Sequence, residues 1–94
     1  MLHLVFELSP ATLGRLQHQS SVIFLNNSVW RLIKNSTFQS ALTELFLFTP
    51  CYVLNEDLTL RGIESDSLLD GITRIDYTQF VELTVNHTPI QTWN

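Results

Sequence analysis

Short apolar runs alternate with segments of helical periodicity along the whole chain, and this alternation constrains the fold more than any other feature. Apolar runs occupy residues 2–6, 21–25 and 51–54, and a weaker run occupies residues 72–75. Each run is followed by residues that start or fill a helix. A β-α-β-α-β-α-β-α order at this spacing predicts an α/β fold, with a mostly parallel sheet of about four strands and helices on both faces.

Turn and capping residues place the predicted helices between these runs. Ser9 precedes a proline, and serine is a good N-cap while proline suits the first helical position. Apolar spacing predicts helical segments over residues 29–33 and 38–46, although the end of the second segment also fits the start of a strand. Asn55 is expected to cap a short helix that stops at Gly62.

The last predicted helix has the clearest boundaries. Asp76 and Gln79 have the spacing of a capping box, His87 lies in the final turn, and Pro89 ends the helix. An inward apolar stripe is expected at Tyr77, Phe80, Val81, Thr84 and Val85.

The composition suggests that this single domain, residues 1–94, meets a partner. Hydrophobic residues make up 45% of the chain and charged residues 15%, against roughly 25% charged residues in a typical soluble domain. So few charges leave apolar surface uncovered, which favours an oligomer or a complex over a compact monomer with an apolar skin.

Charge and cysteine content argue against several classes of protein. The formal net charge is −4 and the five Lys and Arg residues are scattered singly, so direct binding to nucleic acid or to an anionic membrane is disfavoured. The single cysteine cannot form an intramolecular disulfide. The first residues do not resemble a signal peptide, and no apolar stretch reaches membrane-spanning length. A cytoplasmic protein is therefore expected.

Neither a metal nor an organic cofactor is expected. His3, His18 and His87 do not lie at ligand spacing from one another or from Cys51, which argues against a metal site. The turn at residues 7–12 has no glycine and contains a proline, so it does not suit the phosphate of a nucleotide or flavin. An isolated flavodoxin-like ligand binder is kept as a third functional alternative.

Cys51 is the strongest nucleophile in the chain, but its position argues against chemistry. Sites in open parallel sheets lie beyond the carboxyl ends of the strands, whereas Cys51 begins its strand. No Lys, Arg or His flanks it to lower its pKa. Packing in the core is the expected role of Cys51, and catalysis is the alternative.

Three polar residues follow the third apolar run, at the end where a binding site is expected: Asn55, Glu56 and Asp57. One interpretation is structural, with the asparagine as a helix cap and the two acids complementing the positive end of the helix dipole. The other interpretation is a polar surface that recognises a partner.

Two motifs of the chain resemble the TusB/DsrH family. Residues 51–62, CYVLNEDLTLRG, resemble its third-strand motif, in which a hydrophobic residue precedes Leu-Asn-Glu-Asp-Leu-x-x-Arg-Gly. Residues 75–87, IDYTQFVELTVNH, resemble its closing helix, Ile-Asp-Tyr-x-x-Phe-Val-x-Leu-x-x-x-His. Residues 1–3 and the near-terminal Trp93 are also similar, so the resemblance covers essentially the whole chain.

The resemblance implies a small flavodoxin-like, three-layer fold of the DsrE/DsrF/DsrH type and a place in a cytoplasmic sulfur relay. TusB members of the family belong to a TusB–TusC–TusD heterohexamer, which is a dimer of heterotrimers. That assembly passes persulfide sulfur from TusA toward TusE, and the sulfur ends in 2-thiouridine at the tRNA wobble position. The implied partners are therefore TusC- and TusD-like subunits directly, and TusA- and TusE-like carriers indirectly.

The resemblance also implies that this subunit is not catalytic by itself. In the related TusD subunit the working cysteine lies at the end of the strand matching residues 51–54, where this chain has Leu54 and Asn55. Some DsrH proteins carry a cysteine in the first helix, but residues 9–20 contain none. A non-catalytic subunit of a sulfurtransferase complex is the favoured function. The alternative is a DsrH-like sulfur carrier that uses Cys51 as a persulfide, in sulfur oxidation or relay.

Two tryptophans, Trp30 and Trp93, are the expected apolar contacts with partners. The chain departs from the family pattern after the second run, where residues 27–29 read Asn-Ser-Val in place of the usual Asp-Gly-Val. Its first helix is also shorter than usual. If the Asp-Gly pair shapes an interface, the geometry of the partner contact differs in this protein.

Overall fold

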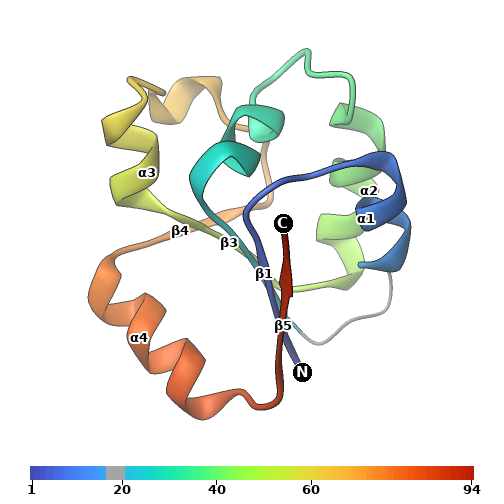
Figure 1. Cartoon of the computed structure of the whole chain (residues 1–94). Coiled ribbons are helices and arrows are strands. Elements are labelled where there is room, and N and C mark those ends of the chain that lie inside the picture. The colour runs from blue at the N-terminus through green and yellow to red at the C-terminus, as the bar shows by residue number, and fades with distance from the viewer. Residues whose placement is uncertain (17–20) are drawn as a thin grey trace.

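Five parallel strands form one sheet in the computed structural model, which describes residues 1–16 and 21–94. The strands are β1 (Leu2–Val5), β2 (Ser21–Phe24), β3 (Cys51–Leu54), β4 (Thr73–Ile75) and β5 (Ile90–Trp93). Their order is β4-β3-β2-β1-β5, and every neighbouring pair is parallel (Figure 1). The predicted α/β class is confirmed, but the sheet has five strands rather than about four.

The sequence does not reveal the fifth strand because β5 lacks an apolar run. It reads IQTW, and its first three residues are exposed. β5 pairs with β1 in a register that runs from Leu2↔Ile90 to Val5↔Trp93, so segments near the two ends of the chain lie side by side. A short edge strand with solvated side chains does not need the apolar pattern by which buried strands are recognised.

The helices lie between the strands in the predicted order. They are α1 (Pro10–Arg15), the 3-10 helix η1 (Asn26–Leu32), α2 (Gln39–Phe48), α3 (Asn55–Leu60), the 3-10 helix η2 (Ser65–Ser67) and α4 (Tyr77–Asn86). Ser9 caps α1 by accepting a backbone N–H at 3.2 Å, and Asp76 and Gln79 form the predicted capping box of α4. The predicted end of the first helix and His18 fall in residues 17–20, outside the described residues.

The segment after β2 is a 3-10 helix rather than the regular helix that its apolar spacing suggests. The buried Ser28 hydroxyl lies 2.6 Å from the Val5 carbonyl oxygen and 2.8 Å from the Leu25 carbonyl oxygen. The bond to Leu25 joins residues three positions apart, and such local bonds between a serine and the backbone compete with regular helical hydrogen bonding. The segment also begins at Asn26 with a φ of 58°, which is not helical.

One face of the sheet, called the closed face below, holds the larger core. Helices α1, η1, α2 and α3 each contribute at least one buried residue to it, and Phe24 is its largest fully buried side chain. Cys51 lies in the same cluster. α2 stays helical through Phe48, so the alternative of a strand over residues 45–48 is wrong.

The opposite face, called the open face below, has a smaller core. Its buried residues are Leu2, Ile23, Leu25, Leu54 and Ile75. Among the described helices α4 alone packs against it, through half-buried Phe80 and Leu83 (Figure 1). The predicted inward stripe is wrong at Tyr77, Val81 and Val85, which are 61%, 42% and 70% exposed. That stripe is wider around the helix than one line of contact with a sheet can bury.

Candidate functional site

A hydrogen-bonded network centred on Asp57 occupies the carboxyl end of the sheet, where a site is expected. Asp57 Oδ2 accepts the backbone N–H of Asn26 at 2.8 Å, and Asp57 Oδ1 pairs with Arg61 Nη1 at 3.2 Å. Arg61 Nη2 also donates to the side-chain oxygen of Asn26 at 2.7 Å. Asn26 has a left-handed φ of 58°, which asparagine tolerates better than most residues. Asp57 and Arg61 therefore hold the turn that follows β2.

A further bond extends this network to the segment after β1. Asn27 Nδ2 donates to Glu7 Oε1 at 2.8 Å, which ties the carboxyl ends of β1 and β2 together. The sequence singles out Asp57 but not these partners, because the bonds to Asn27 and Asn26 join residues 20 to 35 positions apart. Arg61 could have been found, since it stands four residues after Asp57 on one helix face.

Glu56 makes a separate bond that reaches the start of α4. Its Oε2 accepts the backbone N–H of Tyr77 at 2.9 Å. The first N–H groups of a helix have no partner within that helix and favour a nearby negative charge. Glu56 therefore bridges α3 to α4, in addition to lying in the first turn of its own helix.

Asn55 does not cap α3, so that prediction is wrong. The helix begins at Asn55 itself, its N-cap is Leu54, and no side-chain cap bond is formed. A capping residue needs a non-helical backbone, and β3 runs directly into α3 with no spare residue between them. The exposed Asn55 lines an open hollow of about 470 Å³ together with Arg74, Ile75, Asp76 and Gln79.

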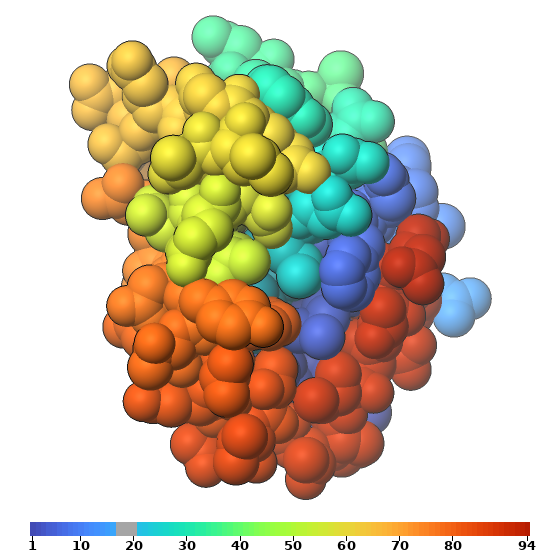
Figure 2. All heavy atoms as spheres, turned by 60° about the vertical axis from the view of Figure 1, so that its left-hand side comes forward, coloured from blue at the N-terminus to red at the C-terminus, as the bar shows by residue number. Residues whose placement is uncertain are grey.

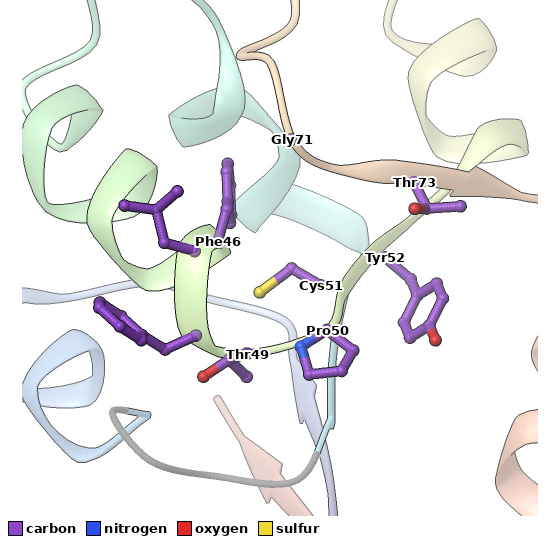
Figure 3. A pocket seen from close by; sticks show the side chains of 9 residues that line it. Phe46, Thr49, Pro50, Cys51, Tyr52, Gly71 and Thr73 are labelled. Atoms are coloured by element: carbon purple, nitrogen blue, oxygen red, sulfur yellow. The ribbon is translucent and has the colours of Figure 1, made fainter.

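Cys51 lies at the opposite, amino end of the sheet, on the closed face. Figure 3 shows its sulfur pointing toward α2, near Phe46. The residue is 3% exposed, and this burial raises the pKa of the Cys51 thiol to about 12. The thiolate is the reactive form of cysteine. Cys51 lines a hollow of about 330 Å³ with Phe46 and Pro50, but its thiol is held in the protonated, unreactive form.

Trp93 joins the two ends of the chain. Its Nε1 donates to Nδ1 of buried His3 at 2.8 Å, and the ring centroids are 6.0 Å apart. The Arg15 guanidinium carbon lies 5.9 Å from the Trp93 ring centroid, within the range of a cation–π interaction. The family-like features at the two ends of the chain thus form one contact. Trp30, by contrast, is 47% exposed on η1.

Metal-ligating side chains do not gather in residues 1–16 and 21–94. His3 is bonded to Trp93, and His87 Nδ1 lies 3.0 Å from the Leu83 carbonyl oxygen. Within the same residues, no helix is both long enough and apolar enough to cross a membrane.

The fold and its carboxyl end define the class of protein. This is a small α/β protein with a parallel sheet, whose carboxyl end carries a polar network and whose single cysteine lies elsewhere. A solved structure of a protein of unknown function from Methanobacterium thermoautotrophicum has the same fold, with a TM-score of 0.73. The match covers 97% of this chain and 95% of that chain at 13% identity, which supports the fold alone.

Sequence similarity identifies the family within this class. The family described as DsrH like protein matches residues 7–90. Proteins named TusB from Salmonella arizonae and Salmonella newport are each 31% identical to this chain over 84 residues, which is 89% of this chain and 85% of those proteins. The chain therefore belongs to the TusB/DsrH family, and the prediction made from its motifs is confirmed.

Proposed function

We propose that this chain is a non-catalytic subunit of a sulfur-relay complex, which supplies persulfide sulfur for 2-thiouridine at the tRNA wobble position. The position of the thiol carries the proposal. In the related TusD subunit the working cysteine lies at the carboxyl end of the matching strand. Here that end holds Leu54 and Asn55, followed by the Asp57 network, and Cys51 is buried at the other end.

Persulfide transfer needs a thiolate on the receiving cysteine. The thiolate attacks the outer sulfur of the donor persulfide, a new S–S bond forms, and the donor cysteine leaves as a thiolate. Because burial raises the pKa of Cys51 to about 12, its thiol stays almost entirely protonated at pH 7. This argues against the sulfur-carrier alternative, and the receiving cysteine is proposed to belong to another subunit.

The proposed direct partners are TusC- and TusD-like subunits in a heterohexamer, with TusA- and TusE-like carriers as indirect ones. Asn55, Glu56 and Trp30 are exposed and are proposed to face partners. Asp57 and Trp93 are more enclosed and are proposed to shape that surface through their internal bonds. The proposed location is the cytoplasm. Direct contact with tRNA is not proposed, because nine acidic residues outnumber five Lys and Arg residues.

Complementation in the native cell tests this function. A strain that lacks the gene receives the wild-type chain or Cys51→Ser, and 2-thiouridine in its tRNA is measured by mass spectrometry. Both chains are expected to restore the modification equally. Loss of 2-thiouridine with Cys51→Ser, while the complex stays intact in size-exclusion chromatography, would favour the carrier function. Unchanged 2-thiouridine in the strain without the gene would reject the pathway itself.

A further inference from the structure

The two edges of the sheet differ in how well they are protected from pairing with another strand. β4 and β5 are the outermost strands of the described sheet, so each has a neighbouring strand on one side only. β4 carries Arg74, which is exposed, and a charged residue on an edge strand discourages pairing with another chain. β5 reads IQTW and has no charged residue and no proline. Figure 2 shows the C-terminal segment, in red, at the surface along one side of the molecule.

The bonds between β1 and β5 show which backbone groups of β5 face inward. The Leu2 N–H donates to the Pro89 carbonyl oxygen at 3.1 Å, and the Phe6 N–H donates to the Trp93 carbonyl oxygen at 2.9 Å. Successive residues of a strand direct their backbone groups to opposite sides of the strand. Pro89 and Trp93 both face β1, so Gln91, midway between them, faces β1 as well.

The backbone groups of Ile90 and Thr92 therefore face away from the sheet. Both residues are exposed, and no strand of the described sheet lies beyond them. The Thr92 carbonyl oxygen accepts a bond from Gln91 Nε2 of the same strand, at 3.2 Å. The other outward groups are the two N–H groups and the Ile90 carbonyl. A row of such groups on an uncharged edge is a template for pairing with another strand.

Gln91 is the central residue between these two outward residues. Trp93 packs against the closed-face core, so the Gln91 side chain, two residues earlier, points to the same face. Gln91 is exposed. Its amide carries both donors and an acceptor, so two Gln91 side chains can bond to each other.

We propose that β5 pairs with β5 of a second copy of this chain, antiparallel and about a two-fold axis beside Gln91. In this register Ile90 lies opposite Thr92 of the second copy, and Thr92 lies opposite Ile90 of the second copy. These are the residues whose backbone groups face outward. Each of the two pairs exchanges both of its N–H···O bonds, as the hydrogen-bonded pairs of an antiparallel ladder do. The exposed bond from Gln91 to the Thr92 carbonyl is replaced by a backbone bond.

The symmetry of β5 selects a second copy over an unrelated strand. The outward residues stand on either side of Gln91, so a two-fold axis there makes the edge complementary to itself. Gln91 faces Gln91 of the second copy as a non-hydrogen-bonded pair, and the two amides bond to each other. Like charges directly opposite would be destabilising, and β5 brings none. The same operation centred on β4 would place Arg74 opposite its own copy.

The contact is short, so a weak and reversible dimer is expected. Pairing is limited to the few residues of β5, and interfaces below about 1,200 Å² are typical of transient complexes. The inference goes beyond the proposed function, because it needs only this chain. The proposed heterohexamer, a dimer of heterotrimers, also holds two copies of the chain, so the contact is compatible with it.

Disulfide trapping tests the register directly. Gln91→Cys and Thr92→Cys both place a thiol at an exposed position, whereas the native Cys51 is 3% exposed. In the proposed pair the Cα atoms of the two residues 91 are about 4.5 Å apart, which a disulfide can bridge. Those of the two residues 92 are roughly 8 Å apart, which is too far without backbone movement.

Under mild oxidation, Gln91→Cys is expected to form a disulfide-linked dimer at least tenfold faster than Thr92→Cys. Non-reducing gel electrophoresis measures both rates. Equal rates, or no dimer from either variant, would overturn the proposed pairing.

Exchange of charge at the axis tests the same contact without a covalent trap. Gln91→Lys and Gln91→Glu should each weaken self-association at least tenfold, because each places like charges directly opposite one another. A mixture of the two variants should associate at least tenfold more tightly than either alone. Thr73→Lys and Thr73→Glu, at an exposed position of β4, are the matched controls and should change it less than twofold. Analytical ultracentrifugation measures association, with thermal melts as the check on folding.

The outcomes separate a second copy from other occupants of the edge. A wild-type chain that stays monomeric at about 1 mM would overturn the inference and leave the proposed function standing. Self-association that Gln91→Lys does not weaken would place the contact elsewhere and would also overturn it. If the wild type does not self-associate and Gln91→Lys weakens binding to a TusC- or TusD-like subunit, the edge pairs with a different polypeptide, which overturns the proposed occupant.

Discussion

The two faces of the sheet are built from the same strands but are covered to different extents. Neighbouring residues of β3 show the difference: Cys51 points into the closed face and is 3% exposed, whereas Tyr52 points to the open face and is half-buried. Side chains alternate between the faces along every strand, so the contrast arises from the helices above them. The closed face therefore holds the larger buried core, and α4 on the open face keeps apolar side chains exposed.

The largest effect is expected from a truncation on the closed face. Phe24 is fully buried there, and Phe24→Ala should lower the free energy of unfolding by about 3–5 kcal/mol through lost burial and a cavity. That is a large part of the roughly 5–15 kcal/mol of a typical domain. Urea denaturation followed by circular dichroism would measure it. A loss below about 1 kcal/mol would show that the closed face is not the main source of stability.

The next effect is expected at the carboxyl end, where Asp57 holds the turn after β2. Asp57→Ala removes the acceptor for the Asn26 N–H and the partner of Arg61. The expected loss of unfolding free energy is about 2 kcal/mol, since hydrogen bonds to charged groups contribute roughly 1.5–3 kcal/mol. Glu56→Ala is the matched control and should cost less, because its carboxylate is more exposed. Equal losses for the two variants would contradict a special role for the Asp57 network.

Elements whose signal is local in the chain can be predicted from the sequence. The four apolar runs correspond to β1 to β4, and the caps at Ser9 and Asp76 depend on residues three positions away. The same kind of local signal wrongly predicts Asn55 as an N-cap, because Asn55 is the first residue of α3 and a capping residue must precede the helix. Local chemistry thus predicts an element better than its exact start.

The contacts that build the candidate site are not local, and the sequence does not encode them as a pattern. The bond between Asn26 and Asp57 joins residues 31 positions apart, and that between His3 and Trp93 joins residues 90 apart. The apolar positions of α4 likewise show which side chains favour burial. They do not show that Tyr77 lies on a flank that the described chain leaves exposed.

A smaller effect, seen in the pH dependence of stability, is expected from Cys51. Burial raises the pKa of its thiol from about 9 to about 12. The protonated thiol is therefore favoured in the folded state, and stability is lost as the pH rises above about 9, where the unfolded chain ionises first. The slope approaches about 1.4 kcal/mol per pH unit.

Paired urea titrations would isolate this contribution. Between pH 7 and pH 10 the wild type should lose about 1.4 kcal/mol more than Cys51→Ser, which has no thiol to ionise. Comparing the change with pH, rather than stability at one pH, cancels the direct cost of the substitution and the titration of other groups. Parallel curves would mean that Cys51 is reached by solvent, which would weaken the argument against a carrier role.

The smallest effect is expected on the exposed flank of α4. Val85 is 70% exposed, so Val85→Ala removes little buried area and places a better helix former in the helix. The unfolding free energy should change by less than about 0.5 kcal/mol, as for most surface substitutions. Leu83→Ala, on the half-buried side of the same helix, is the matched control and should cost more.

Repeating both measurements at several protein concentrations sharpens the contrast between the faces. A Val85→Ala loss above about 1 kcal/mol that grows with concentration would mean that copies of the chain already cover the open face, because association with the native state raises apparent stability by mass action.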